Sequence, residues 1–299
     1  MQSPELTIDA SIGTTAAEVE RDRARLREFV EAHPRLFVLT GAGCSTDSGI
    51  PDYRDTNGGW KRPQPVTYQA FMGEKATRQR YWARSLVGWR RFGRAQPNAT
   101  HRALARLEQQ GRIATLLTQN VDGLHQAAGA RHVIELHGGL DRTICLTCGE
   151  RSTRVAIDSA LREANPTFDA RARAINPDGD AELSEADLDR FVMVTCAVCR
   201  QGPLKPDVVF FGEGVPRERV ERCYQLVERA KALLVLGSSL TVMSGYRFVV
   251  RATKLQIPVA IVNQGSTRAD GCASIRVDAP LGVVLPALAA GYLGRRLGP

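Results

Sequence analysis

The stretch of the chain that decides its fold reads LFVLTGAGCSTDSGIPDYR and covers residues 36–54. An apolar strand that opens into a turn rich in glycine and serine lets backbone amides approach a pyrophosphate, because no Cβ atom stands in the way. Gly41 and Gly43 fit the start of the dinucleotide-binding fingerprint, but Gly49 comes three positions too late for its third glycine. Lys61 and Arg62 stand where an acidic residue would bind the adenosine ribose. The sequence therefore predicts a different kind of nucleotide site, in which the nucleotide reacts rather than being only held.

Short apolar runs alternate with helical patterns over most of the chain, which predicts an α/β fold with a Rossmann-like, doubly wound parallel sheet. The expected strands are 36–39, 113–117, 133–136, 208–211, 232–236, 258–262 and 274–277. The expected helices are 18–31, 75–92, 98–110, 216–230, 245–255 and 281–293. Ligands of such folds bind at the carboxyl ends of the strands. Polar motifs follow the strands at that edge, and they begin at Gly41, Gln119, His137, Gly212, Gly237 and Asn263.

The composition is typical of a globular protein: 43% of the 299 residues are hydrophobic and 24% are charged. The chain contains no run of apolar residues long enough to predict a membrane span. Residues 1–20 include several acidic side chains and no lysine or arginine, which argues against a secretory signal and against a basic transit peptide. We therefore expect a cytoplasmic protein that does not bind membranes.

The net charge of +8 is unevenly distributed, because arginines are concentrated between residues 78 and 112. Such a concentration can attract nucleic acid or acidic protein surfaces. It is also typical of a solvated helix face. Arginine greatly outnumbers lysine throughout the chain, which weakens any argument from arginine count. We therefore expect no stable binding of nucleic acid.

Four of the seven cysteines form two Cys-x-x-Cys pairs, a ligand set typical of a tetrahedral structural Zn²⁺ site. The expected ligands are Cys145, Cys148, Cys196 and Cys199. A redox role is the alternative, but neither pair has thioredoxin-like surroundings. Four sulfur ligands leave no open coordination position, so the expected metal would not take part in the chemistry.

These features divide the chain into parts. Residues 1–34 are expected to form an N-terminal leader and helix, and residues 35–141 with 205–299 a Rossmann-like nucleotide-binding domain. A helical insertion is expected at about 56–94. A small zinc-binding module is expected at 142–204, where the alternation of strands and helices is interrupted.

A series of motifs, in order along the chain, resembles those of the sirtuins, a family of NAD-dependent protein-lysine deacylases. They are Gly-Ala-Gly to Asp-Tyr-Arg at 41–54, Thr-Gln-Asn-Val-Asp-Gly-Leu-His at 118–125, His-Gly-Gly at 137–139, the two cysteine pairs, Lys-Pro-Asp-Val-Val-Phe-Phe-Gly-Glu at 205–213, Gly-Ser-Ser-Leu at 237–240 and Val-Asn-Gln-Gly at 262–265. The residues at 43–48 and 80–84, together with the long interval between the cysteine pairs, resemble class II, bacterial-type members.

The resemblance implies that NAD is a consumed co-substrate, and it assigns roles to residues. His137 and Asn120 would be the catalytic residues. A neutral imidazole placed between a strand and two glycines suits His137 as general base. Asn120 and Asp122 would hold the nicotinamide amide and the ribose, although Asp122 at a strand-to-helix turn is also typical of a helix N-cap. The NAD-binding residues would be Gly41, Ala42, Gly43, Ser45, Asp52, Tyr53, Arg54, Gln119, Asn120, Asp122, Gly237, Ser238, Ser239, Asn263, Gln264, Gly265 and Leu281.

The implied reaction moves an acyl group from a lysine of a protein substrate to ADP-ribose. The acyl oxygen attacks the nicotinamide ribose, nicotinamide leaves, and His137 deprotonates a ribose hydroxyl, which yields free lysine and O-acyl-ADP-ribose. Two other functions remain open at this point. One is mono-ADP-ribosyl transfer to a protein side chain, and the other is NAD sensing without catalysis.

The resemblance places the acyl-lysine channel at Phe210, Phe211 and Gly212, with the substrate peptide adding as a strand. Tyr81 and Arg84 have the Tyr-x-x-Arg spacing of sirtuins that remove acidic acyl groups, so an acidic-acyl pocket is one alternative. The density of arginines around Arg84 favours the other alternative, an aromatic and apolar channel. In that case Arg84 faces solvent and the channel accepts acetyl or longer neutral acyl groups.

Overall fold

Six parallel strands form the central sheet in the computed structural model, which describes residues 16–53, 59, 61, 65–170, 179–181, 183–184, 188 and 190–292. They are β1 (Leu36–Thr40), β2 (Ile113–Thr118), β3 (Val133–Glu135), β7 (Leu233–Leu236), β8 (Val259–Val262) and β9 (Ile275–Val277). Their order, β3-β2-β1-β7-β8-β9, is that of a doubly wound dinucleotide-binding fold. The predicted fold class is confirmed, and the six strands begin and end within one residue of the predicted positions.

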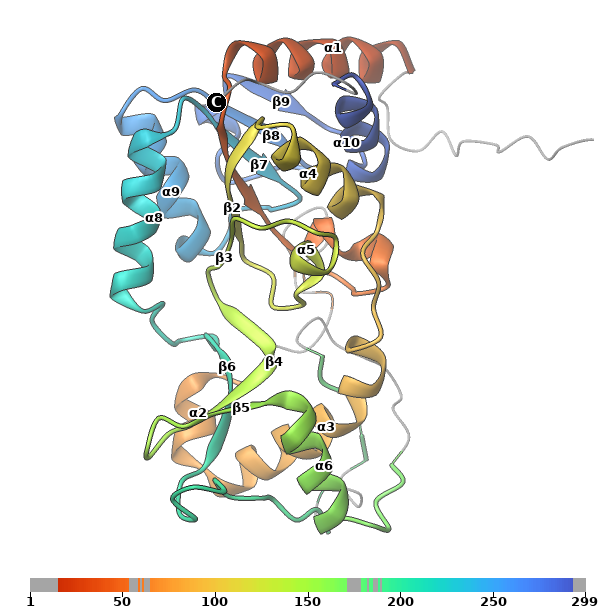
Figure 1. Ribbon diagram of the computed structural model, residues 1–299, viewed down its shortest axis with the longest axis vertical. Coiled ribbons are helices and arrows are strands. Elements are labelled where there is room, and N and C mark those ends of the chain that lie inside the picture. The colour runs from red at the N-terminus through yellow and green to blue at the C-terminus, as the bar shows by residue number, and fades with distance from the viewer. Residues whose placement is uncertain are drawn as a thin grey trace, which may run out of the picture.

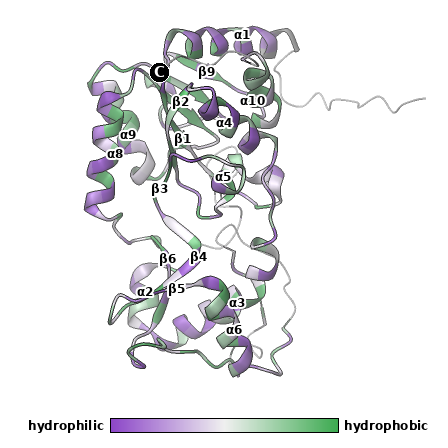
Figure 2. Cartoon of the chain, viewed as in Figure 1, coloured by the Kyte–Doolittle hydropathy of each residue, from purple (hydrophilic) through white to green (hydrophobic). Residues whose placement is uncertain are grey.

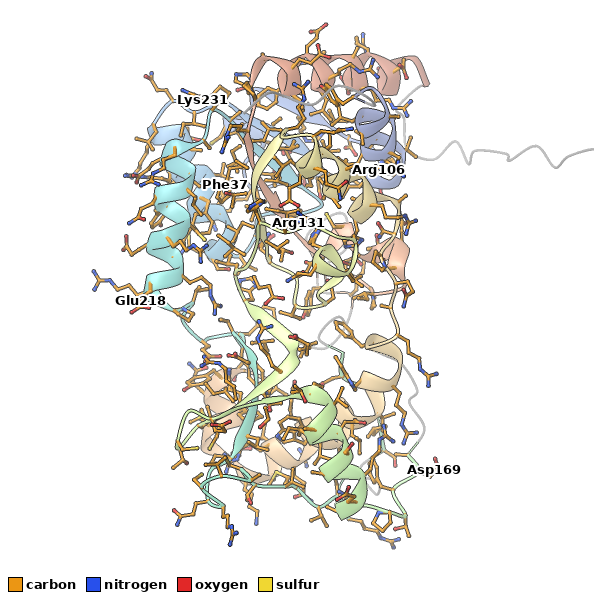
Figure 3. The ribbon with its side chains drawn as sticks, in the orientation of Figure 1. Phe37, Arg106, Arg131, Asp169, Glu218 and Lys231 are labelled. Carbon is orange, nitrogen blue, oxygen red and sulfur yellow. The ribbon has the colours of Figure 1, made fainter. Side chains whose placement is uncertain are left out.

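Helices cover both faces of this sheet (Figure 1). They are α1 (Ala16–Ala32), α4 (Ala99–Gln109) and α10 (Leu281–Ala290) on one face, and α8 (Arg217–Arg229) and α9 (Met243–Lys254) on the other. Val38 packs with the first group and Phe37 with the second, as alternation along a strand requires. Phe37 lies inside the molecule, whereas Glu218 of α8 points outward (Figure 3). Because both faces are covered, β1, β7 and β8 are continuous apolar runs (Figure 2).

A second, antiparallel sheet with the order β5-β4-β6 lies at the other end of the molecule (Figure 1). Its strands are β4 (Gly138–Cys145), β5 (Arg151–Thr153) and β6 (Leu204–Val208), and the helices that share its core are α2 (Tyr68–Gly73), α3 (Lys75–Phe92) and α6 (Arg154–Ala164). The pattern of the sequence did not predict β4, β5 or α6. The sheet begins before residue 142 and continues past residue 204, so it extends beyond the expected zinc-binding module on both sides.

The prediction of a parallel strand at 208–211 is wrong. The strand of this region is β6, which ends at Val208 and pairs antiparallel with β4 in the second sheet. The apolar run after it is buried for another reason. Phe210 packs edge-on against Phe71 and tilted against Tyr81, with ring centroids 5.1 and 5.3 Å away. Gly212 therefore does not follow a strand of the central sheet.

Short helical segments complete the described part of the chain. They are α5 (Leu124–Ala127) and the 3₁₀ turns η1 (Ala42–Cys44), η2 (Thr46–Ser48) and η3 (Asp270–Cys272). The six predicted helices are present, with ends that differ by at most three residues. Among the described helices, none has both the length and the apolar character needed to cross a membrane.

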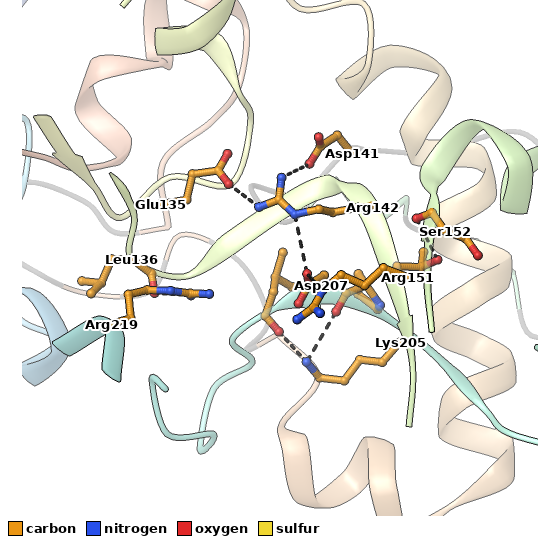
Figure 4. Close-up of polar contacts among 12 residues, drawn as sticks. Glu135, Leu136, Asp141, Arg142, Arg151, Ser152, Lys205, Asp207 and Arg219 are labelled. Atoms are coloured by element: carbon orange, nitrogen blue, oxygen red, sulfur yellow. Dashed lines mark hydrogen bonds and ion pairs between the residues drawn. The ribbon is translucent and has the colours of Figure 1, made fainter. Parts of the chain in front are cut away.

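A cluster of charged side chains joins the two sheets (Figure 4). Arg142 of β4 forms ion pairs with Glu135, at the end of β3, and with Asp207 of β6, 3.6 Å from its Nε. Asp141 pairs with the same guanidinium at 2.9 Å, and Arg151 pairs with Asp207 at 3.0 Å. These side chains are partly exposed, so each pair contributes little to stability. Together they link the middle of β4 to β3, at the edge of the central sheet.

Two histidines lie buried next to each other behind the carboxyl ends of β1 and β2. The rings of His101 in α4 and His125 in α5 are 4.7 Å apart, and neither side chain is accessible to solvent by more than 1%. Thr40 Oγ1 lies 3.0 Å from His125 Nε2, and the Asn98 N–H donates to His101 Nδ1 at 3.3 Å. Burial lowers the pKa of His101 to about 4 and that of His125 to about 3. His125 is thus a buried residue of a short helix.

This pair predicts a loss of stability in mild acid. Both pKa values are lower in the folded than in the unfolded protein, so the unfolded state binds more protons below about pH 6.5. The free energy of unfolding should fall by about 1.4 kcal/mol per pH unit for each histidine as the pH drops from about 6 to about 4. Urea titrations at several pH values measure this slope. His101→Gln should flatten it, and an unchanged slope in a folded variant would contradict the assignment.

Candidate active site

A cavity of about 870 Å³ opens where the strand order of the central sheet reverses, between β1 and β7. The Gly43 N–H donates to Gly237 O at 2.9 Å, so the two loops that follow these strands touch. A Cβ atom on Gly41 would lie 2.7 Å from Gly237 O, which explains why glycine is required there. Gly237 itself has φ = +59°, a conformation that few other residues adopt. This point of a doubly wound sheet is where such folds bind nucleotides.

Most of the residues predicted to bind the nucleotide line this cavity. They are Gly41, Ala42, Gly43, Ser45, Asp52, Tyr53, Gln119, Asn120, Asp122, Gly237, Ser238, Ser239, Asn263, Gln264 and Leu281, and His137 lines it too. Gly265 is not among the lining residues. Its N–H donates to Asp278 Oδ1 at 3.2 Å, and its carbonyl accepts from Asn263 and Arg276 at 3.0 and 2.8 Å, so it lies behind Asn263. Arg54 lies outside the described residues.

Asn120, Ser45 and Asp122 form a hydrogen-bonded row along one wall of the cavity. Asn120 Nδ2 donates to Gly41 O at 3.1 Å and to Ser45 Oγ at 3.0 Å, and Ser45 Oγ donates to Asp122 Oδ2 at 2.7 Å. The other carboxylate oxygen accepts the Leu124 N–H at 2.9 Å, at the start of α5. Burial raises the pKa of Asp122, and the bonds from Leu124 and Ser45 oppose that shift. The row presents an amide and a carboxyl group to a ligand.

His137 lies at the turn between β3 and β4 and is held from two sides. Its Nδ1 lies 2.8 Å from Gln119 O, and its Nε2 lies 2.9 Å from Ser244 Oγ. Burial lowers the pKa of His137 and Arg219 lowers it further, while the bond to Gln119 acts in the opposite direction. The imidazole is therefore neutral near pH 7 and can take up a proton. Ser244 could not be identified from the sequence, because a serine in a helix carries no signal of its own.

Aromatic side chains line the other part of the cavity. Tyr81, Phe210 and Phe211 line it together with Val208 and Gly212. Tyr53 meets Phe211 edge-on, with ring centroids 5.7 Å apart. This wall can enclose an extended apolar group.

An ion pair between Lys205 and Glu213 supports the aromatic wall. Lys205 is 4% exposed, and its Nζ lies 3.0 Å from Glu213 Oε2 and 2.5 Å from Val208 O. The same Glu213 oxygen accepts the Phe210 N–H at 2.8 Å. The ends of the segment 205–213 are thus tied together, which fixes the position of Phe210.

Helix α3 contributes two of its described side chains to the cavity. Tyr81 and Phe92 line the cavity, whereas Arg84, Trp82 and Trp89 are not among its lining residues. Trp82 Nε1 donates to Leu204 O at 3.0 Å, away from the cavity. Arg84 is half-buried, and its carbonyl accepts the Ala181 N–H at 3.1 Å. Arg84 therefore does not line the cavity. It is also not fully exposed, although we expected it to face solvent.

The four predicted zinc ligands come together at the end of β4, in the part of the molecule that contains the antiparallel sheet. The Sγ atoms of Cys145, Cys148, Cys196 and Cys199 all lie within 4.8 Å of one another. The distances are 3.6 Å for Cys145–Cys199 and 3.7 Å for Cys148–Cys196. A tetrahedral zinc with Zn–S bonds of about 2.3 Å requires sulfurs about 3.8 Å apart, so the cluster fits Zn²⁺. A Cβ atom on Gly202 would lie 2.1 Å from Cys145 Sγ, so glycine is needed beside the cluster.

Comparisons with known proteins agree with this fold. The family model described as "Sir2 family" matches residues 41–244, and the chain belongs to this family, the sirtuins. An NAD-dependent protein deacetylase of Xanthomonas axonopodis pv. citri is 60% identical over 86% of this chain and 87% of its own length. NAD-dependent protein deacetylase 1 of Streptomyces coelicolor is 55% identical over 88% of this chain and 87% of its own length.

Solved structures of Sir2 proteins have a similar fold. A Sir2 complex with a p53 peptide and NAD⁺ superposes with a TM-score of 0.70 at 27% identity, covering 89% of this chain and 97% of the other. A Sir2 protein bound to a propionylated peptide superposes with a TM-score of 0.70, also at 27% identity, and covers 90% of this chain and 97% of the other.

Proposed function

We propose that this protein is an NAD-dependent protein-lysine deacylase that transfers the acyl group to ADP-ribose and releases nicotinamide and O-acyl-ADP-ribose. The observation that carries the proposal is that His137 lines the same cavity as the row Asn120–Ser45–Asp122. A neutral base and a row of amide and carboxyl groups thus face one cavity. Relatives named NAD-dependent protein deacetylases and Sir2 complexes with NAD⁺ and peptide support it.

Different residues of this chain would bind NAD, accept the proton and enclose the acyl-lysine. When bound, NAD would supply the nicotinamide leaving group and the ribose that receives the acyl group. Backbone N–H groups of the 41–45 turn would face the pyrophosphate. Asn120 and Asp122 would hold the nicotinamide amide and the ribose, and His137 would accept the proton of a ribose hydroxyl at Nε2. Phe210 and Phe211 would enclose the acyl-lysine and exclude water.

The proposal includes one structural Zn²⁺ per chain, held by the four-cysteine cluster in the module at about 142–204. It also includes a cytoplasmic location, which a cluster of metal-binding thiolates favours because such thiols persist in reducing compartments. The substrates would be acyl-lysine side chains of proteins rather than nucleic acids or membrane lipids.

Incubation with NAD labelled in the adenosine moiety and an acetyl-lysine peptide tests the proposed function. Label in O-acetyl-ADP-ribose, with equal amounts of nicotinamide and deacetylated peptide, is the expected result. Label attached to protein instead would show mono-ADP-ribosyl transfer. Binding of NAD without release of nicotinamide, over a panel of acyl peptides, would identify an NAD-sensing protein.

For the acyl group, we propose a preference for neutral chains. The part of the cavity beside Tyr81 is aromatic and apolar, and Arg84 does not line it. Arg84→Met should therefore change kcat/KM for an acetyl-lysine peptide by less than about twofold, because no buried acyl carboxylate loses its partner. Succinyl and glutaryl peptides should be poor substrates of both proteins.

Arg90→Met, an exposed arginine on the same helix, is the matched control for the loss of a positive charge. A large loss of desuccinylation or deglutarylation in Arg84→Met alone, with deacetylation spared, would establish an acidic-acyl pocket instead.

A further inference from the structure

Ser244 contacts the imidazole of His137 on the side opposite to Gln119. Nδ1 of the ring lies 2.8 Å from Gln119 O, and Nε2 lies 2.9 Å from Ser244 Oγ. A carbonyl oxygen only accepts hydrogen bonds, so Nδ1 carries the ring proton and Nε2 has the lone pair. The Ser244 hydroxyl therefore donates to the nitrogen that would act as the base.

The first turn of α9 is placed so that Ser244 reaches this nitrogen. Ser244 is the second residue of α9 and lines the cavity together with His137. The next residue, Gly245, packs against Gln119, where a Cβ atom would lie 2.5 Å from Oε1. Gln119 is also the residue whose carbonyl holds Nδ1. The close approach of α9 to Gln119 thus brings together both partners of His137.

We propose, on the basis of the deacylase function above, that Ser244 is a positioning residue for the general base. It would hold the imidazole with Nε2 toward the cavity and support the imidazolium that forms during the reaction. The Ser244 hydroxyl would first turn its proton away, which frees the Nε2 lone pair to take the proton of a ribose hydroxyl. The ribose oxygen would keep the electron pair for its new bond to the acyl carbon, and the π electrons of the C–N double bond at that carbon would move to the lysine nitrogen. Ser244 would keep its own proton, and its oxygen would accept from the new Nε2–H.

The effect of Ser244 on proton affinity has a definite sign. A hydrogen bond from a charged imidazolium to an oxygen is stronger than one from a hydroxyl to a neutral imidazole. Ser244 therefore favours the protonated form of His137. Arg219, which donates to Leu136 O at 2.9 Å, acts in the opposite direction, as does burial. Asp122 and Arg247 also line the cavity, and all of these groups remain in a Ser244 variant.

Steady-state kinetics over a range of pH test the proposal. Ser244→Ala should lower kcat roughly 10- to 100-fold, a part of what general-base catalysis contributes. The KM values for NAD and acetyl peptide should change less than about twofold, and the rising limb of kcat/KM should move to lower pH. Ser244→Thr, which keeps a hydroxyl, should restore most of the activity. Thr253→Val removes a hydroxyl elsewhere on α9 and should match the wild type.

A titration of the ligand-free protein gives a second readout that does not depend on activity. The imidazole pKa of His137, followed by NMR and assigned by the signal missing in His137→Ala, should fall by roughly 0.5 to 1 pH unit in Ser244→Ala. If Ser244→Ala does not fold, Ser244→Cys replaces it, because a thiol is a weak acceptor.

Three results would overturn the role of Ser244: an unchanged pKa of His137, a wild-type kcat, or a loss confined to KM. If the pKa of His137 falls in Ser244→Ala but the wild-type protein shows no NAD-dependent deacylation, the proposed function is overturned instead.

Discussion

Replacement of His137 by alanine is expected to lower kcat for deacylation by roughly 10²- to 10⁴-fold, the usual contribution of a general base. The reason is its position. The ring is held between Gln119 O and Ser244 Oγ, burial keeps it neutral, and it faces the cavity that the nucleotide-binding loops form. Affinity for NAD should be nearly unchanged, because Asn120 and Asp122 remain in place. Nicotinamide release and isothermal titration with NAD measure the two quantities.

A matched control is His33→Ala, which removes an imidazole at the end of α1. Its Nδ1 is bonded to Phe29 O at 2.8 Å, and it is not among the residues that line the cavity. This variant should retain wild-type turnover. If His137→Ala also turns over at the wild-type rate, another group removes the proton and the assignment of the base is wrong.

Removal of the metal should also lower activity strongly, but it should do so by destabilising the fold. Cys148→Ser takes one of four ligands from a cluster that joins chain segments 47 residues apart. Zinc binding at four-cysteine sites contributes on the order of 10 kcal/mol to folding. The part of the molecule around the antiparallel sheet should therefore lose its order. The melting temperature should fall, and activity should be lost indirectly. A strong chelator should do the same to the wild-type protein.

Cys272→Ser is the control, because Cys272 is an exposed cysteine outside the cluster. Its melting temperature should equal that of the wild type. Metal analysis of freshly purified protein should find about one zinc per chain. A protein purified without zinc that is nevertheless folded and active would rule out the structural metal.

The central sheet could be predicted because its physical signal is local. A strand covered on both faces must be apolar along its whole length, and runs such as LLVL at 233–236 show this directly. The polar turns after β1, β2, β7 and β8 could be placed at one edge because parallel strands share their carboxyl ends. That rule placed the motifs beside the cavity, whereas the individual lining residues were implied by the resemblance to the sirtuins.

The second sheet and parts of the site could not be predicted, because they depend on contacts between distant segments. The run at 208–211 is as apolar as a strand, but Phe210 is buried by aromatic rings of α2 and α3 rather than by a sheet. Gly265 belongs to the predicted NAD-binding motif at 262–265, but it lies behind Asn263 and does not line the cavity. Ser244 is a neighbour of His137 only because α9 begins next to Gln119.

The position of β1 in the middle of the central sheet has a consequence for how the protein folds. On one side β1 pairs with β2, but on the other side Phe37 pairs with Leu233, near the far end of the chain. Pairings between such distant segments form slowly, because a long loop must be closed before any contact compensates for its entropy. During synthesis, β1 to β3 can assemble first and leave the edge of β1 open until β7 has been made. The nucleotide cavity is lined on one side by the loop that follows β1 and on the other by the loop that follows β7. It can therefore form only after the last third of the chain has joined the sheet.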